Sequence, residues 1–460
     1  MTTNIATRST RSVLDRAGIQ GQTITIGESG WDAARQAWNL AVDQRPLAVV
    51  FPDSTADVIA TVRAAQELGA RIVTQGTGHG ATAYTTLDDS ILVRTIGLRD
   101  ISISGRTCRV GSGALWGDVA AAAAKGGLAG LGGSSPDVGV VGYTLGGGIG
   151  WLSRRYGLAS NAVTAIELVT ADGRLRRIDT FEEPEAFWAL RGGGGGLGIV
   201  TALEFDLFPI RTVIAGTLAW DAAHSARLLD AWASWTSGLD HSITSIIRFL
   251  SLPDVPGIPE PFAGKRVMTL GVTATPDYPH AQDRIEEMRG LAPTVLDTIA
   301  PVSPSTLCRL HGDPEGPTAG MSHHTLVARM DSTMVEALVD VAGPDSGSGL
   351  ISMEVRHLGG ALARIPIGAG ALSHIAAPYV VNAVAAAFDA DMAAASYSEL
   401  GRTIDAIAPW SAGTYMNFME RPGPSPFDPV TTARLTAVKN EFDPAGMFRS
   451  RDITTGTAWS

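Results

Sequence analysis

Glycine is concentrated in three short segments, and each could bring bare backbone N–H groups close to an anionic ligand. The segments are 76–80, 130–150 and 192–198, in a chain of 460 residues with 53 glycines. A glycine loop after a strand lets main-chain donors approach a phosphate without hindrance from side chains. Three such loops in one region predict a large ligand with several points of contact, such as a dinucleotide.

The first of these loops departs from the Rossmann nucleotide-binding pattern. That pattern has one Gly-x-Gly-x-x-Gly opening a helix and an acidic residue about 20 positions later. No helical periodicity follows Gly80, and residues 81–89 have the irregular composition of a loop. We therefore expect several loops, and no single helix N-terminus, to hold the dinucleotide.

His79 lies inside the first loop, in the stretch Gln75-Gly-Thr-Gly-His-Gly80. A single loop histidine is usually structural or exposed. Beside a flavin it has a specific use, because a neutral imidazole is a nucleophile that can bond to the 8α-methyl carbon. The loop by itself leaves both interpretations open.

Several common catalytic motifs are absent. The sequence has no Gly-x4-Gly-Lys-Ser/Thr, no His-Glu-x-x-His, no Cys-x-x-Cys and no Gly-x-Ser-x-Gly, which argues against a P-loop NTPase and an α/β-hydrolase. Cys108 and Cys308 are too few for a disulfide framework or a cysteine-rich site, and we expect no metal. The adjacent His323 and His324 are interpreted as part of a surface loop.

Local patterns predict the elements that position the first loop. An apolar run at 46–51 predicts a buried strand, and Ser54 is placed to cap a helix that stops at Gly69. Residues 71–74 predict a second strand, parallel to the first, that leads directly into the loop.

A predicted strand at 350–358 alternates polar and apolar side chains. The two faces carry different sets, Ser352, Glu354 and Arg356 on one and Met353, Val355 and His357 on the other. This predicts a sheet that packs on helices behind and lines a polar cleft in front. Residues 414–418 predict a final strand and residues 431–442 a closing helix.

The charge balance limits the expected partners. Lys and Arg number 35 and Asp and Glu 46, a formal net charge of −11. Nucleic acids and anionic lipid surfaces both require concentrated basic residues. No window is long and apolar enough for a spanning helix, and residues 1–20 lack the apolar core of a secretory signal. We expect a cytoplasmic protein without nucleic-acid or membrane partners; nothing in the sequence indicates its oligomeric state.

Six separated stretches resemble one known family. In chain order they are Pro46–Pro52, Gln75–Gly80, Ser135–Gly157, Glu185–Thr201, Tyr415–Asn417 and Phe442–Arg449. The chain resembles the berberine-bridge-enzyme-like flavin oxidases of the vanillyl-alcohol-oxidase superfamily, and within it the bacterial hydroxynicotine-oxidase-like branch. The resemblance implies an α+β fold with a two-subdomain, PCMH-type FAD-binding domain (1–211). It also implies a substrate domain with an antiparallel sheet backed by helices (212–408), and a C-terminal segment (409–460) that returns to the FAD domain.

The resemblance further implies FAD bound covalently through His79. Backbone N–H groups of 76–80 and 139–142 would hold the pyrophosphate, and residues 198–200 would lie near the adenosine. Many relatives have a second flavin bond through a cysteine at the position of Ser135, so we expect attachment through histidine only. The implied cofactor-binding residues are Gln75, Gly76, Thr77, Gly78, His79, Gly80, Ser135, Gly139, Val140, Gly142, Gly198, Ile199, Val200 and Asn417.

The catalytic candidates are Tyr415, Asn417, Tyr143, Glu354 and Arg356. Tyr415 occupies a position that resembles the family segment facing the flavin, either as base or to orient substrate; the alternative is a half-buried strand tyrosine. A tyrosine, with a pKa near 10, needs a lowered pKa to act as a base. Asn417 would share its face of the strand, and Tyr143 would reach the cavity. Glu354 and Arg356 would either bind a polar substrate or pair with each other.

The implied reaction is oxidation of a small alcohol, sugar or amine, such as a secondary-metabolite intermediate. Hydride would pass from a substrate C–H bond to flavin N5, and O2 would reoxidise the flavin and give H2O2. Two alternatives stay open. One is a flavin dehydrogenase with another acceptor, and the other is a non-redox flavoprotein such as a cyclase of natural-product biosynthesis.

Overall fold

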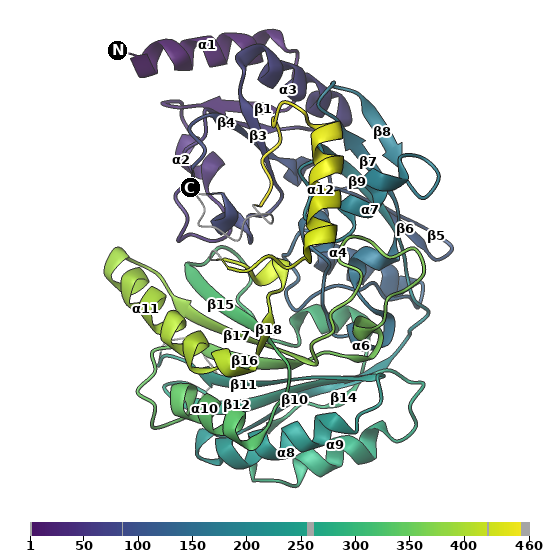
Figure 1. The fold of residues 1–460 in the computed structure, drawn as a ribbon, viewed down its shortest axis with the longest axis vertical. Helices are drawn as coiled ribbons and strands as arrows, with labels where there is room; N and C mark the ends of the chain where they lie inside the picture. Colours follow the sequence, from purple (N-terminus) through teal and green to yellow (C-terminus); the bar gives the residue numbers. More distant parts are fainter. Residues whose placement is uncertain (1, 85, 255–261, 421–422, 452–460) are drawn as a thin grey trace.

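The computed structural model describes residues 2–84, 86–254, 262–420 and 423–451, which form three β-sheets surrounded by helices (Figure 1). Two smaller sheets and their helices make up the upper part of Figure 1, and one large sheet crosses the lower part. The α+β class predicted from the sequence is confirmed.

The first small sheet has the strand order β1-β2-β4-β3. Its strands are β1 (Gln22–Thr25), β2 (Ala48–Phe51), β4 (Ser90–Arg94) and β3 (Arg71–Gln75), and both β2 and β3 run parallel to β4 between them. Helix α3 (Thr55–Leu68) connects β2 to β3. The hydroxyl of Ser54 accepts a hydrogen bond from the N–H of Asp57 at 3.2 Å, and Gly69 ends the helix at φ +62°. Both predicted helix boundaries are therefore confirmed.

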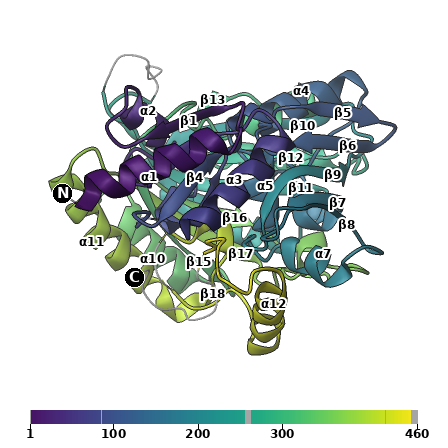
Figure 2. The same cartoon turned by 90° about the horizontal axis from the view of Figure 1, so that it is seen from above.

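The second small sheet has the strand order β5-β6-β9-β7-β8. Its strands are β5 (Ile101–Ser104), β6 (Thr107–Gly111), β9 (Ile199–Asp206), β7 (Val163–Val169) and β8 (Leu175–Ile178). Val58 and Val62 of α3 share a hydrophobic core with Val169 and Ile199, so α3 packs between the two sheets. Figure 2 shows the sheets side by side, with α1 (Thr2–Arg16) and α3 over the first. The shorter helices of this part are α2 (Trp31–Arg35), α4 (Trp116–Lys125), α5 (Val140–Leu145), α6 (Ser153–Tyr156) and α7 (Pro184–Leu190).

Neighbouring strands of the large sheet pair in antiparallel orientation. Across the sheet its strands are β13 (Thr294–Asp297), β10 (Val213–Asp221), β12 (Arg266–Ala274), β11 (Ile243–Ser251), β16 (Ser352–His357), β17 (Tyr379–Ala386), β15 (Gly320–Val327) and β18 (Ser411–Gly413), and β14 (Ala300–Val302) pairs with β10. One face is covered by α8 (Ser225–Ser237), α9 (Ala281–Arg289), α10 (Ser332–Ala342) and α11 (Ala390–Ala406) (Figure 1). Met353 and Val355 lie in that core. Arg356, on the opposite face as the alternation predicted, faces the second glycine segment (130–150), called the glycine-rich segment below.

The strand predicted at 414–418 is wrong. The strand β18 stops at Gly413, and a single 3-10 turn follows at Met416–Phe418. The turn closes through hydrogen bonds from the N–H of Phe418 to the carbonyl of Tyr415 and from Met419 to Met416. Gly413 has φ +115°, a conformation that turns the chain away from the sheet edge.

The C-terminal part of the chain contacts both halves of the molecule. While β18 is a strand of the large sheet, helix α12 (Pro429–Phe442) packs on α7, and Phe448 forms a bridge with Ile72 of β3. The division of the chain at 211 and 408 stays a prediction. None of the helices in the described ranges has the length and apolar character that crossing a bilayer would need.

Candidate functional site

The glycine loop after β3 lies against the segment that carries Trp38. The N–H of Trp38 donates to the carbonyl of Thr77 at 3.0 Å. Gly78 has φ +97°, and a Cβ there would lie 2.8 Å from the nitrogen of Trp38, so only glycine fits. Among the described residues, no backbone N–H of 77–80 donates to another protein group. Consecutive unpaired N–H groups of this kind are the donors that anion-binding loops offer.

His79 is fixed from two sides. The ring of Trp38 stacks on its imidazole, with centroids 3.9 Å apart and 22° between the planes. Its Nε2 lies 3.3 Å from Oδ1 of Asp137, although the alignment falls short of a hydrogen bond. A carboxylate beside Nε2 favours the tautomer with the proton on Nε2, which leaves the lone pair on Nδ1.

Asp137 connects the glycine loop to two further segments. Its carboxylate accepts hydrogen bonds from Nε1 of Trp38 at 2.6 Å, the hydroxyl of Ser135 at 2.7 Å and the N–H of Gly316 at 2.9 Å. Burial would raise the pKa of Asp137, but His79 and these donors outweigh burial and hold the pKa well below its usual range. Asp137 is therefore ionised beside the imidazole.

Unpaired buried atoms around the loop fit a polar cofactor. Gln75, at the end of β3, has both side-chain polar atoms buried without a partner in the described protein. The hydroxyl of Ser112 is likewise buried without a partner there. A Cβ on Gly76 would lie 3.8 Å from the carbonyl oxygen of Ser112, so these residues are neighbours. Because buried polar groups are normally hydrogen-bonded, a dinucleotide such as FAD suits the available donors and acceptors.

The second glycine segment brings α5 beside the same loop. A Cβ on Gly139 would lie 3.9 Å from Cγ2 of Thr77. The N–H of Val140 donates to the carbonyl of Ala114 at 3.0 Å, so it is already used within the protein. Gly142 has no atom within 4 Å of a Cβ and presents open space.

Residues 198–200 lie at the start of β9, where the second sheet meets α3. Ile199 and Val200 are buried, and their side chains belong to hydrophobic cores. Ile199 pairs with Val169, and Val200 pairs with Leu168. A contact between these residues and a cofactor therefore involves their backbone and not their side chains.

Three catalytic candidates meet at the glycine-rich segment. The phenol oxygen of Tyr415 accepts hydrogen bonds from the N–H of Gly148 at 2.9 Å and from Nδ2 of Asn417 at 3.1 Å. Nδ2 of Asn417 also donates to the carbonyl of Tyr143 at 2.9 Å. The hydroxyl of Tyr143 donates to the carbonyl of Leu131 at 3.1 Å, so it is already bonded inside the protein. Tyr415 and Asn417 come together through the 3-10 turn, not through strand alternation.

Tyr415 is almost fully buried, with 2% of its surface exposed. Burial raises the pKa of its phenol well above the usual value, although the hydrogen bonds from Gly148 and Asn417 act in the opposite direction. The phenol is therefore neutral at ordinary pH. Because the phenol oxygen is the acceptor in both of these hydrogen bonds, the phenol proton is available for donation to another group.

The interpretation of His323 and His324 as a surface loop is wrong, because both lie on β15. Pairing with β17 and β18 places His324 inside the protein, where its Nε2 accepts a hydrogen bond from the N–H of Tyr415 at 2.8 Å. Burial, with His323 beside it, lowers the pKa of His324 to about 3. The neutral imidazole thus holds the backbone of the Tyr415 turn.

Glu354 and Arg356 pair, at 2.7 Å between Oε1 and Nε. Glu354 is 1% exposed, and its other oxygen lies 2.7 Å from Nε2 of His311. Nδ1 of His311 in turn lies 2.5 Å from Oδ1 of Asp313. Burial would raise the pKa of Glu354, but Arg356 and His311 hold it well below its usual range. Two carboxylates therefore flank one imidazole: Glu354 is buried on the sheet, and the side chain of Asp313, outside the strands, is 32% exposed.

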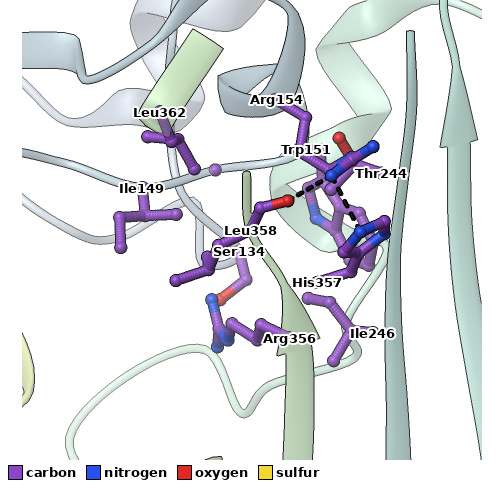
Figure 3. A pocket seen from close by; sticks show the side chains of 11 residues that line it. Ser134, Ile149, Trp151, Arg154, Thr244, Ile246, Arg356, His357, Leu358 and Leu362 are labelled. Atoms are coloured by element: carbon purple, nitrogen blue, oxygen red, sulfur yellow. Dashed lines mark hydrogen bonds between the residues drawn. The ribbon is translucent and has the colours of Figure 1, made fainter. Parts of the chain in front are cut away.

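Arg356 also faces a narrow pocket beneath the glycine-rich segment (Figure 3). The pocket is lined by Ser134 and Ile149 on one side and by Ile246 of β11 on the other, and its volume is about 10 Å³, room for roughly one water. The guanidinium of Arg356 lies 5.0 Å from the ring centroid of Phe418, which contacts Tyr415. Phe418 therefore links the Glu354–Arg356 pair to the Tyr415 turn.

Several residues of the site had no assigned role in the sequence: Trp38, Asp137, His311, Asp313 and His324. Asp137 stands within the Ser135–Gly157 stretch, two positions after Ser135, so the motif itself was a signal. The others contact the site from distant positions, and no local pattern marks them. Among the described residues there is no group of three His, Cys, Asp or Glu side chains placed to hold a metal ion.

Comparisons with known proteins agree with the geometry. Residues 46–179 match the family described as FAD binding domain. The chain is 31% identical to (R)-6-hydroxynicotine oxidase of Paenarthrobacter nicotinovorans over 459 residues, which cover 94% of this chain and 96% of the relative.

Solved structures show the same fold. The crystal structure of 6-hydroxy-D-nicotine oxidase from Arthrobacter nicotinovorans superposes with a TM-score of 0.82 at 27% identity, covering 95% of this chain and 98% of that one. A single-residue variant of berberine bridge enzyme superposes with a TM-score of 0.77 at 20% identity, covering 96% and 98%. The second similarity concerns the fold alone.

Proposed function

Since the chain belongs to the berberine-bridge-enzyme-like family of FAD-linked oxidoreductases, we propose that it oxidises a small organic molecule with FAD attached through His79 and with O2 as electron acceptor. The observation that carries this proposal is the setting of His79. The imidazole projects from a loop with unpaired N–H groups and has a carboxylate beside Nε2. This arrangement prepares Nδ1 as a nucleophile.

The residues around the loop would hold the cofactor. The N–H groups of 77–80, which have no acceptor among the described residues, would bind phosphate oxygens, and the unpaired amide of Gln75 at the end of β3 would offer further donors and acceptors. Attachment through His79 would replace one C–H of the 8α-methyl group and the imidazole N–H by a C–N bond. The two electrons and two protons so released would pass to O2 and give H2O2. Ser135 has no thiol, so we expect no second bond to the flavin.

When bound, FAD supplies a two-electron acceptor that takes hydride from a substrate C–H bond and returns the electrons to O2. We assign Tyr415 to substrate positioning: its neutral phenol donates a hydrogen bond to the substrate oxygen or nitrogen next to that C–H bond. Asn417 and Gly148 hold the phenol oxygen, and His324 holds the backbone, so the donor is pre-organised.

The test of oxidase activity is anaerobic mixing with candidate alcohols, sugars and amines. Bleaching of the yellow colour without air, followed by one H2O2 per turnover on admission of air, is expected for the substrate. Bleaching without peroxide would instead support a dehydrogenase. A spectrum that stays yellow with every compound would support a non-redox flavoprotein.

A further inference from the structure

The guanidinium of Arg356 uses only part of its hydrogen-bonding capacity. Its Nε donates to Glu354 at 2.7 Å. Within the described chain, neither Nη1 nor Nη2 hydrogen-bonds to a protein group, although the residue is only 9% exposed. Guanidinium groups in such surroundings normally bind planar oxyanions through paired N–H groups. Nη1 and Nη2 of Arg356 thus carry N–H groups that no protein acceptor uses, close to the ring of Phe418.

The charge of the surrounding cluster is fixed by its hydrogen bonds. The two short contacts of His311, at 2.5 Å to Asp313 and 2.7 Å to Glu354, each need one proton between nitrogen and oxygen. One imidazole and two carboxylates with two such protons carry a charge of −1, wherever the protons reside. Arg248 and Arg356 each add +1, so the cluster carries a net charge of +1.

Arg248 contributes to this balance because it touches the same imidazole. Its Nη1 lies 3.1 Å from Nδ1 of His311, and its Nη2 donates to the carbonyl of His311 at 2.9 Å. The remaining titratable groups that face Arg356 are Tyr143 and Tyr415, and burial raises the pKa of both phenols, which are therefore neutral. No protein group neutralises the excess positive charge among the described neighbours. An uncompensated charge in a buried site strongly favours binding of a counter-ion.

We propose that the substrate is an organic anion, and that its carboxylate binds to Nη1 and Nη2 of Arg356. The subsite lies next to Phe418 and the Tyr415 turn, so the carboxylate anchors the molecule while the phenol of Tyr415 orients its reacting end. This inference rests on the proposed function, because it names the class of molecule that the same site oxidises. It also excludes an uncharged sugar as the preferred substrate.

The test uses two ligands of equal shape, benzoate and benzamide, added to the purified holoenzyme in calorimetric titrations at pH 7. Benzoate is expected to bind at least about tenfold more tightly than benzamide. The variant Arg356→Gln is expected to lose this preference, with benzoate weakened at least about tenfold and benzamide unchanged. Arg356→Lys should retain part of it. The matched control is Arg289→Gln, which removes a guanidinium from the exposed side of α9.

Equal affinity of the wild-type protein for the two ligands would overturn the proposal. So would a benzoate affinity in Arg356→Gln that matches the wild type. If Arg356→Gln fails to fold, the wild-type comparison and Arg356→Lys decide the question. Flavin content is measured in the same samples, so that failure of the anion subsite at Arg356 can be distinguished from failure of the proposed flavin oxidase function. Flavin present without a benzoate preference removes the anion subsite alone, whereas a benzoate preference in protein without flavin removes the proposed function alone.

Discussion

The phenol oxygen of Tyr415 accepts a hydrogen bond from the backbone N–H of Gly148 at 2.9 Å, across 267 residues of sequence. This bond joins the C-terminal turn to the glycine-rich segment that the flavin site is expected to use. Because Asn417 donates to the same oxygen, the phenol proton points away from both donors. Tyr415 is thereby held in position as a hydrogen-bond donor, and its neutral phenol is not suited to accept a proton from the substrate.

Replacing Tyr415 with phenylalanine should separate positioning from flavin binding. Tyr415→Phe is expected to reduce kcat by about 10²-fold, since the substrate loses its oriented donor. The flavin content should stay at the wild-type level. The measurement is steady-state kinetics with the flavin absorbance as a measure of active sites. A variant with full kcat would contradict the assigned role.

If Tyr415 acted as the base, the pH profile of kcat would instead show loss of activity below its pKa. For the wild type we therefore expect kcat, measured by steady-state kinetics, to be independent of pH around pH 10, where an ordinary tyrosine would titrate. A loss of kcat as the pH falls through this range would contradict the assignment. The pKa of the buried phenol is raised well above its ordinary value, so the neutral form persists through alkaline pH.

Asp137 should control how readily the covalent bond forms. Asp137→Asn removes the carboxylate next to Nε2 of His79, so the tautomer with the lone pair on Nδ1 loses its support. Attachment is expected to slow by about tenfold or more. The measurement is the fraction of flavin that stays with acid-precipitated protein. Ser135→Ala serves as the control, because it removes one hydrogen bond to the same carboxylate and keeps its charge.

Stability should fall in acid because His324 is buried in the neutral form. Its pKa is about 3 in the folded protein against a usual 6.5, so between these values the unfolded chain binds a proton that the folded chain does not. The free energy of unfolding should therefore decrease as the pH falls below about 6.5, by up to about 1.4 kcal/mol per pH unit. Urea denaturation at pH 7 and pH 5 measures this loss. His324→Gln should show a smaller loss of stability, and an equal loss would refute the claim that the buried neutral form of His324 causes it.

The Glu354–Arg356 pair should matter far more for stability than a surface pair. Glu354→Gln leaves Arg356 with a neutral partner in a buried site, and we expect a loss of about 3–5 kcal/mol. The matched control is Glu167→Gln, whose partner Arg109 is part-exposed at 39%, with an expected loss of about 0–1 kcal/mol. Urea denaturation of both variants tests the difference. Equal losses would show that burial does not strengthen the Glu354 pair.

The sequence predicted those parts of the site that local patterns encode. The strand, cap, helix and glycine stop at 46–69 follow from short-range rules, and so does the alternation along β16. The glycine loops indicated a ligand with several contacts because glycine is costly unless a backbone conformation or a close approach requires it.

The sequence could not supply the long-range contacts. His311 reaches Glu354 across 43 residues, and Asn39 and Trp38 reach the glycine loop from a segment without a regular pattern. His323 and His324 are interpreted from the sequence as a surface loop, and only the pairing of β15 with β17 shows that they lie on a strand, with His324 buried. The Tyr415–Asn417 contact was expected from a strand period of two, but a 3-10 turn produces it.

Acid precipitation of the purified protein, followed by absorbance of pellet and supernatant, is the most direct test of the histidyl linkage. A yellow pellet is expected from the wild type, and a colourless pellet from His79→Ala. His280→Ala, which removes an exposed imidazole elsewhere, should behave as the wild type. Flavin released from the wild-type protein into the supernatant, or a yellow pellet from His79→Ala, would contradict attachment through His79.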